Sequence, residues 1–227
     1  KDVSIALQIH PSDKTTVEIG TLAMKAYTVD FHGKTAHAAA DPWNGNNALD
    51  AVLTLFNSVA QWRQHIRPGE RVHGIITHGG AAPNIIPDHT QARFYIRSPF
   101  DERIDGMLEK FRSLCESAAS MSGCTVEFTD PDYGRLRTFL NNPTLVRIFR
   151  DNMAAAGWSE HPASEDTGSS DMSNVSWEVP TIHPMMACGP VGTPGHSREF
   201  SAFAGGPEGE TTAIESARIL GWTVVDL

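Results

Sequence analysis

The sequence predicts an α/β domain that is interrupted by an inserted α+β domain. Between residues 22 and 128, hydrophobic patterns of strand and helix type follow one another in the order β-α-β-β-α-β. The segments on either side alternate short apolar runs with helical patterns, which is typical of a mostly parallel α/β core. We therefore expect residues 1–20 and 135–227 to form one discontinuous domain around an insertion of residues 21–134.

Periodicity predicts each element of the insertion. Strands are expected at residues 22–31, 72–77, 90–97 and 124–128, and helices at about residues 47–66 and 101–122. Apolar residues at helical spacing mark the first helix: Ala48, Val52, Leu55, Phe56, Val59 and Trp62. The third strand alternates inward residues with outward ones: Ala92, Phe94 and Ile96 against Gln91, Arg93, Tyr95 and Arg97. This order is the split βαβ (ferredoxin-like) arrangement, in which two helices cover one face of a four-stranded antiparallel sheet.

The flanking domain shows weaker patterns. Residues 3–9 resemble a buried strand that delivers His10 at its end, just before Pro11. In the C-terminal part the expected elements are a helix at residues 143–157, a strand at 180–188, a Gly/Pro loop at 189–197 and a helix at 209–222.

The composition is that of an ordinary globular protein, with 227 residues, 40% hydrophobic and 20% charged. The net charge of -9 argues against nucleic acid and anionic membrane as partners. Three unpatterned cysteines suggest neither disulfides nor a zinc knuckle, so a cytoplasmic protein with reduced thiols is expected. No membrane span or signal peptide is recognisable, and a start at Lys1 in a strand pattern suggests a fragment or a processed chain.

Three histidine sites are the first candidates for chemistry. His37 lies in a small-residue turn between a predicted strand and a predicted helix, while His10 and His196 lie near opposite ends of the chain. A lone loop histidine is usually a solvated surface side chain, and His10 alone could simply end its strand. The three together favour a hydrolytic centre.

The sequence gives little support to a serine hydrolase. The segment Gly195-His196-Ser197-Arg198-Glu199 resembles a nucleophile elbow, but Glu199 stands where that turn needs glycine. The sequence also lacks GxxxxGK[ST], HExxH and a GxGxxG that follows a strand.

A metal centre is better supported. His10 and His196 could bind zinc, manganese or cobalt together with carboxylates of the loop between them, namely Glu165, Asp166 and Asp171. A pair of catalytic metals needs more ligands than these, and the chain has neither a Glu-Glu pair nor a His-x-Asp.

Four motifs occur in the order of a known family: Gly33-Lys34-Thr35-Ala36-His37-Ala38 with Pro42 and Asn47-Ala48, Asn84-Ile85-Ile86-Pro87 with Arg97, Ser170-Asp171-Met172-Ser173-Asn174-Val175-Ser176, and Thr193-Pro194-Gly195-His196-Ser197. The chain resembles the C-terminal half to two-thirds of the cocatalytic-metal amidohydrolases and peptidases, which include aminoacylase, glutamate carboxypeptidase and succinyl-diaminopimelate desuccinylase. It is most similar to the p-aminobenzoyl-glutamate hydrolase type and its dipeptidase relatives.

The resemblance implies roles for the inserted domain. That domain would be a lid that pairs with its twin in a homodimer, and His37 would be a catalytic residue that reaches the partner's active site and stabilises the oxyanion. Asn84 and Arg97 would bind the substrate, Arg97 through a carboxylate, which suits its planar fork of donors.

The resemblance also implies a metal site in the flanking domain. His10 and His196 would be metal ligands, and Asp171 would support the site without binding metal itself. The complete enzyme would hold two divalent ions (zinc, manganese or cobalt), while this chain would hold none or one, since the family's other ligands precede its first residue. The isolated chain is accordingly expected to be inactive.

The expected activity is metal-dependent hydrolysis of the amide bond of an N-acyl amino acid, aminobenzoyl-glutamate or a dipeptide. The partners would be a small amide substrate with a carboxylate and a second copy of the chain. The alternative is a non-catalytic dimerising or substrate-binding module with the same lid.

Overall fold

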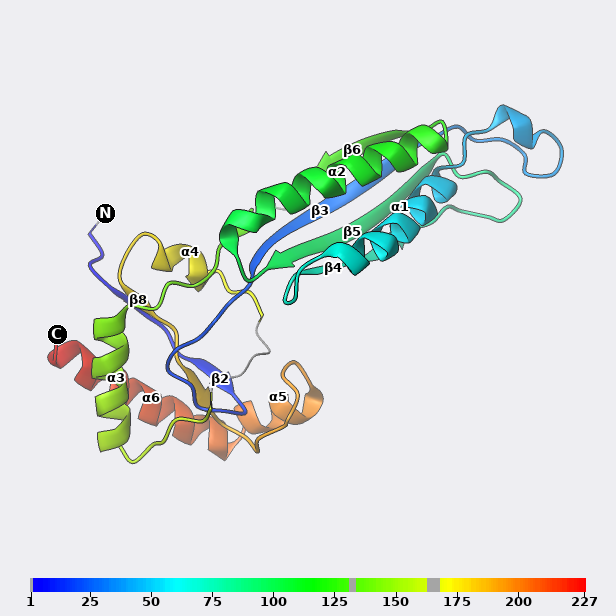
Figure 1. Ribbon diagram of the computed structural model, residues 1–227. Helices are drawn as coiled ribbons and strands as arrows, with labels where there is room; N and C mark the ends of the chain where they lie inside the picture. Colours follow the sequence, from blue (N-terminus) through cyan, green and yellow to red (C-terminus); the bar gives the residue numbers. More distant parts are fainter. Residues whose placement is uncertain (1, 131–133, 163–167) are drawn as a thin grey trace. The chain divides into compact units, whose positions relative to one another are not determined.

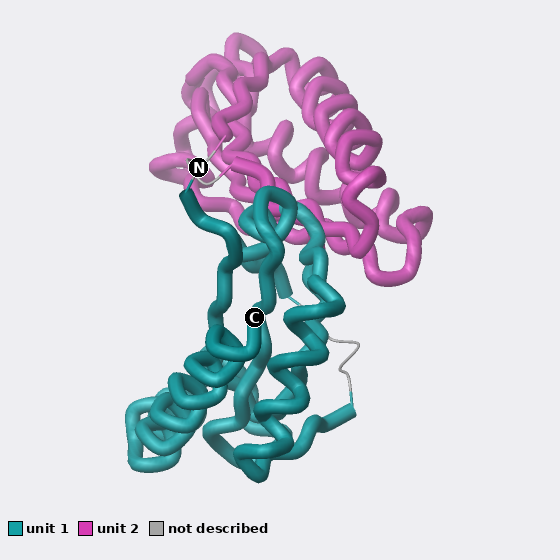
Figure 2. Tube along the Cα trace, turned by 90° about the vertical axis from the view of Figure 1, so that its left-hand side faces the viewer, with its two compact units in different colours: residues 1–21, 137–227 teal, residues 22–136 magenta. Residues whose placement is uncertain are grey.

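The computed structural model describes residues 2–130, 134–162 and 168–227. The chain forms two compact units: unit 1 comprises Lys1–Thr21 and Arg137–Leu227, and unit 2 comprises Leu22–Leu136 (Figure 2). The second boundary lies two residues beyond the expected one. The reason is that β7 (Arg135–Leu136) pairs with β3 (Ala23–His32), Leu136 opposite Met24, and so belongs to the sheet of unit 2.

Unit 2 is an antiparallel sheet with two helices on one face (Figure 1). Its other strands are β4 (Arg71–His78), β5 (His89–Ser98) and β6 (Thr125–Thr129), and the spatial order is β4-β5-β3-β6. The helices are α1 (Ala48–Trp62) and α2 (Ile104–Met121). Single 3-10 turns lie at Pro42–Asn44, Arg63–His65 and Asp101–Arg103.

Alternation along the strands explains why the helices pack on one face. Ala92, Phe94 and Ile96 of β5 are fully buried under the helices, as predicted. The ring of Phe94 lies 4.9 Å from that of Phe56 and 5.0 Å from that of Phe111, measured between centroids, so one aromatic cluster joins both helices to the sheet.

Unit 1 is built on two short parallel strand pairs. β1 (Ala6–Leu7) pairs with β8 (Thr181–Ile182), and β2 (His10–Ser12) pairs with β9 (Met185–Ala187). Two helices, α3 (Pro143–Ala155) and α6 (Pro207–Val225), pack on them through a core of apolar residues. Its buried members are Val17, Leu145, Val146, Phe149, Met153, Ile182, Met186 and Ile219.

The two strands expected in unit 1 are each broken. His10 starts β2 instead of ending a single strand at residues 3–9, and the strand expected at 180–188 is split between Ile182 and Met185. Pro184 falls in this second break, where it has no N–H to donate and its carbonyl accepts from His10 N at 3.0 Å.

Two short helices are not expected from the sequence. They are α4 (Met172–Ser176), inside the loop that carries Asp171, and α5 (Arg198–Ala204), which follows His196. Both are too short for hydrophobic periodicity to identify. Among the helices of the described residues, none is long and apolar enough to cross a membrane.

The core of unit 2 predicts a difference between two leucines of α1. Leu55 is fully buried, whereas Leu53 is 46% exposed. Leu55→Ala should lower the free energy of unfolding by about 2–5 kcal/mol because it leaves a cavity, and Leu53→Ala should change it by no more than about 0.5 kcal/mol. Urea denaturation followed by circular dichroism measures both, and equal losses would contradict the packing described.

Candidate active site

His10 and His196 line the same pocket of unit 1. The pocket has a volume of about 420 Å³, and its other lining residues include Asp13, Thr193, Ser197 and Phe200. The pairing of β2 with β9 carries His10 into this pocket, and the loop that leads into α5 carries His196. The two histidines that the sequence predicts to act together therefore line the same cavity.

The ring of His10 is held by its own backbone. Its Nδ1 lies 2.7 Å from the carbonyl oxygen of Pro11. A carbonyl oxygen only accepts, so Nδ1 carries the proton and the neutral ring keeps its lone pair on Nε2. This is the tautomer that a metal-binding histidine needs, with a backbone partner that fixes the orientation of the ring.

His196 has an unusual backbone conformation. Its φ of 58° makes it the sole non-glycine residue with positive φ in the part of the chain that the structure describes. A left-handed histidine is energetically costly, and such residues cluster at functional sites. The conformation follows Gly195 and precedes Ser197, whose Oγ caps α5 by accepting a hydrogen bond from Phe200 N at 3.0 Å.

The structure adds a histidine that the sequence patterns do not single out. His183 is 2% exposed, and its ring lies 5.9 Å from that of His10. Burial, with a smaller contribution from His10, lowers the pKa of His183 to about 4, while Asp171 acts in the opposite direction. Its Nδ1 is buried and has no hydrogen-bond partner in the described part of the chain. The sequence predicts only a buried strand for Thr181–Cys188. The one feature of this run that could indicate a functional residue is that it contains a histidine.

The predicted carboxylates are only partly placed. Asp171 lies at the start of α4 and is exposed, close enough to influence the pKa of His183. Glu165 and Asp166, the other two candidate ligands of this loop, lie outside the described residues. Among the described residues, no group of three or more His, Cys, Asp or Glu side chains is arranged to hold a metal ion.

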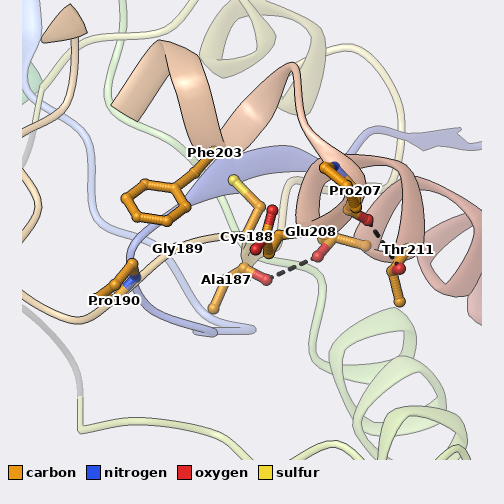
Figure 3. Close-up of a pocket in the computed structure, with 9 residues that line it drawn as sticks. Ala187, Cys188, Gly189, Pro190, Phe203, Pro207, Glu208 and Thr211 are labelled. Atoms are coloured by element: carbon orange, nitrogen blue, oxygen red, sulfur yellow. Dashed lines mark hydrogen bonds between the residues drawn. The ribbon is translucent and has the colours of Figure 1, made fainter. Parts of the chain in front are cut away.

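A pocket of about 530 Å³ elsewhere in unit 1 contains none of these candidates (Figure 3). It is lined by residues from Ala187 to Pro190 and by α5 and α6, and burial raises the pKa of its thiol, Cys188. Thr212 Oγ1 donates to the carbonyl of Ala187 at 2.9 Å, so this polar group is already used within the fold.

In unit 2 the structure brings His37 and Asn84 together. Ala38 N donates to the carbonyl of Asn84 at 3.0 Å, and His37 forms an antiparallel bridge with Ile85. Gly33 explains part of the first motif: a Cβ at this position would lie 2.1 Å from the carbonyl oxygen of Asn46. The loop before α1 therefore approaches too closely for any larger residue.

The ring of His37 has a defined tautomer. Its Nδ1 accepts hydrogen bonds from Ala39 N at 3.2 Å and Ala40 N at 3.1 Å. With Nδ1 as the acceptor, the proton of the neutral ring is on Nε2, which is left as an N–H donor. Such a donor is what an oxyanion requires.

Arg97 lies at the opposite end of the sheet. It is opposite Met24 at the start of β3, whereas the loop with His37 follows His32 at the end of the same strand. Eight residues of extended strand span about 27 Å. Within one chain, therefore, Arg97 and His37 are far apart, and Arg97 instead lines a pocket on the sheet with Arg93, Tyr95 and His73.

Comparison with known proteins identifies the inserted unit. Residues 19–121 match the family described as the peptidase dimerisation domain. Unit 2 is therefore similar to this domain, and the resemblance of the chain to amidohydrolases and peptidases that carry it is confirmed.

Two curated relatives show how far the similarity extends. The chain is 33% identical over 232 residues to Xaa-Arg dipeptidase of Homo sapiens, covering 100% of this chain and 52% of the relative. It is 25% identical over 252 residues to one of the subunits of p-aminobenzoyl-glutamate hydrolase of Escherichia coli (strain K12), covering 86% and 52%. The chain therefore spans about half the length of these relatives.

Solved structures show the same fold. An aminobenzoyl-glutamate utilization protein from Klebsiella pneumoniae superposes with a TM-score of 0.67 at 20% identity, covering 96% of this chain and 54% of that one. A hydantoinase/carbamoylase family amidase from Burkholderia vietnamiensis gives a TM-score of 0.73 at 14% identity, covering 99% and 55%.

The position of Ser197 predicts a structural effect of its removal. Ser197→Ala should lower the free energy of unfolding by about 1 kcal/mol because α5 loses its cap, and Ser197→Asp should retain most of the stability because aspartate also caps helices. Thermal unfolding followed by calorimetry measures the difference. If both variants were equally destabilised, the hydroxyl would have a role other than capping.

Proposed function

We propose that the protein to which this chain belongs is a metal-dependent amidohydrolase, acting on an N-acyl amino acid, aminobenzoyl-glutamate or a dipeptide. The observation that supports this most directly is that His10 and His196 line one pocket, where the His10 ring is held by the carbonyl of Pro11 and His196 has a left-handed backbone. The relatives are named as hydrolases of amide bonds, which supports the same reaction class.

His10 and His196 would hold a divalent ion, and the residues present fit that role. Two imidazole side chains that line one cavity suit zinc, manganese or cobalt. A metal bound there, one of two in the complete enzyme, would polarise the amide carbonyl and make a bound water more acidic. Asp171 and His183 would support the metal ligands without binding the ion. The His183 ring lies 5.9 Å from that of His10, and the pKa of His183 responds to both Asp171 and His10.

His37 would donate its Nε2–H to the developing oxyanion, with Asn84 beside it at the same end of the sheet. Arg97 would bind the carboxylate of the substrate. One chain cannot easily use both groups at one site, because the length of the sheet lies between them. A site that takes Arg97 from one subunit and His37 from the other removes this difficulty.

A homodimer through unit 2 supplies that arrangement. The order of elements and the strand order β4-β5-β3-β6 support the split βαβ (ferredoxin-like) type for this unit. Strand β4 is at the edge of the sheet and carries Ile75, 63% exposed, and Ile76, 39% exposed. An exposed edge with apolar side chains suits pairing with a second copy.

The alternative is a dimerising or substrate-binding module without catalysis. It is favoured by one observation: among the described residues, no cluster of three or more metal-ligating side chains is found. Tightly bound stoichiometric metal together with amidase activity in the purified protein would exclude this alternative.

The ligand role predicts the effect of removing His196. His196→Ala should lose bound metal and at least about 100-fold in kcat, because one nitrogen donor disappears. Metal content is measured by mass spectrometry after dialysis, with His65→Ala, an exposed histidine outside the pocket, as the matched control. Unchanged metal content in His196→Ala would refute the ligand role.

The oxyanion role predicts a different effect for His37. His37→Ala should lower kcat by about 10²–10³ and leave the metal bound, because only a transition-state donor is lost. Mixing this variant with His196→Ala should restore about a quarter of wild-type activity, since random mixing makes half of the dimers hybrids with one complete site each.

The control for this mixing experiment is His37→Ala combined with a chain that carries both substitutions, which should restore nothing. An absence of restoration in the first mixture would show that His37 acts within its own subunit or not at all.

A further inference from the structure

The pocket on the sheet of unit 2, here called the cationic pocket, contains Arg97, which the proposed function assigns to the substrate carboxylate, and also Arg93, which has no role in that proposal. It has a volume of about 420 Å³ and is lined by His73, Gly74, Ile75, Arg93, Tyr95 and Arg97. Two of the six lining residues are arginines and none is acidic, in a protein with a net charge of -9.

Strand register places these side chains on the face without helices. His73 is opposite Tyr95, and Ile75 is opposite Arg93, so each pair projects from the same side of the sheet. The residues between them, including Phe94 and Ile96, are buried in the core under the helices. Alternation therefore directs the pocket residues to the other side.

Tyr95 forms the centre of the cationic pocket. The guanidinium carbon of Arg97 lies 5.5 Å from the centroid of the Tyr95 ring, and the His73 ring lies 5.9 Å from it. Arg93 and Arg97 are four residues apart on β5, about 14 Å along the strand, and their long side chains let both border one cavity. The Tyr95 ring thus forms an apolar surface between two cationic side chains, Arg93 and Arg97.

The charge of Arg93 has no acidic partner within residues 2–130, 134–162 and 168–227. Arg93 is exposed and makes no ion pair with any of the described residues. Asp30, an acidic residue of the neighbouring strand β3, already has partners: its Oδ1 lies 2.8 Å from His89 Nε2 and 2.9 Å from Gln91 Nε2. An exposed arginine beside a second arginine favours an anionic ligand over a cationic one.

We propose that the cationic pocket selects substrates whose amino-acid residue carries a second carboxylate, with Arg93 as the specificity-determining residue that binds it. Arg97 takes the α-carboxylate, and the body of the residue lies over Tyr95. This inference rests on the proposed function. The favoured substrates are N-acylated aspartate or glutamate, and a residue with a cationic side chain is disfavoured by repulsion from Arg93.

The proposed preference agrees with the name of one curated relative and not with that of the other. The names of the curated relatives specify a glutamate amide in one case and an arginine at the second position of a dipeptide in the other. The chain is more similar in sequence to the second kind, whereas the charge of the cationic pocket agrees with the first.

The test compares three probes on the complete protein to which this chain belongs, purified and loaded with metal: N-benzoyl-glutamate, N-benzoyl-alanine and N-benzoyl-arginine. Both kcat/KM and the affinity measured by calorimetry are determined. The wild type should prefer the glutamate probe over the alanine probe by about tenfold, since charged hydrogen bonds of this kind are only partly screened. The arginine probe should be the poorest.

Arg93→Gln should remove the preference for glutamate through KM, with kcat and the alanine probe little changed, and Arg93→Lys should keep part of it. Arg71→Gln is the matched control, because Arg71 is opposite Arg97 on the same face but does not line the cationic pocket. It should leave all three probes unchanged.

Two results would overturn the inference alone. One is an unchanged glutamate preference in Arg93→Gln, and the other is hydrolysis of the alanine or arginine probe at least as fast as that of the glutamate probe by the wild type. If the loaded protein hydrolysed none of the probes, the proposed function would fail and this inference with it.

Discussion

The pairing of β2 with β9 is the interaction on which the candidate metal site depends. It joins the N-terminal segment to a strand near the other end of the chain, with His10 opposite Met185 and Ser12 opposite Ala187. The chain between these two strands includes all of unit 2, so it must leave unit 1 and return to it. Thr21 is the last residue of unit 1 before the insertion. Its hydroxyl lies 2.8 Å from Ser173 Oγ and accepts a hydrogen bond from Phe139 N at 2.8 Å. Both contacts are buried, and they connect the two ends of the discontinuous unit just where the insertion begins.

The sheet of unit 2 separates functional residues by a fixed length. A strand cannot shorten without losing its ladder of hydrogen bonds, so the loop of His37 and the position of Arg97 stay at opposite ends. A rigid spacer of this kind makes the distance between two sites a property of backbone geometry and not of loop conformation.

Elements with strong periodicity can be predicted from the sequence, and the others cannot. Both helices of unit 2 lie within a few residues of their expected positions because their apolar faces pack on a sheet. In unit 1, strands of two or three residues are too short to show alternation, so His10 is expected at the end of a strand when it begins one. Helices of five and seven residues escape prediction for the same reason.

The candidate site is predictable only where a motif signals it. His10 and His196 can be chosen from the sequence, but the left-handed backbone of His196 and the hydrogen bond of His10 depend on local geometry. His183 cannot be selected as a site residue from the sequence, because a residue within an apolar run usually belongs to the hydrophobic core. The outward orientation of Arg93 and Arg97 follows from alternation, whereas their shared pocket depends on the register of β4 against β5.

The open edge of β4 has a consequence for the behaviour of the protein in solution. Its outer backbone groups have no neighbouring strand in the sheet, and two isoleucines next to one another are partly exposed there. An uncovered strand of this kind is a template for any extended chain, including a misfolded one, and therefore a starting point for aggregation. A partner subunit that covered this edge would thus also act as protection, so the solubility of each copy would depend on the other.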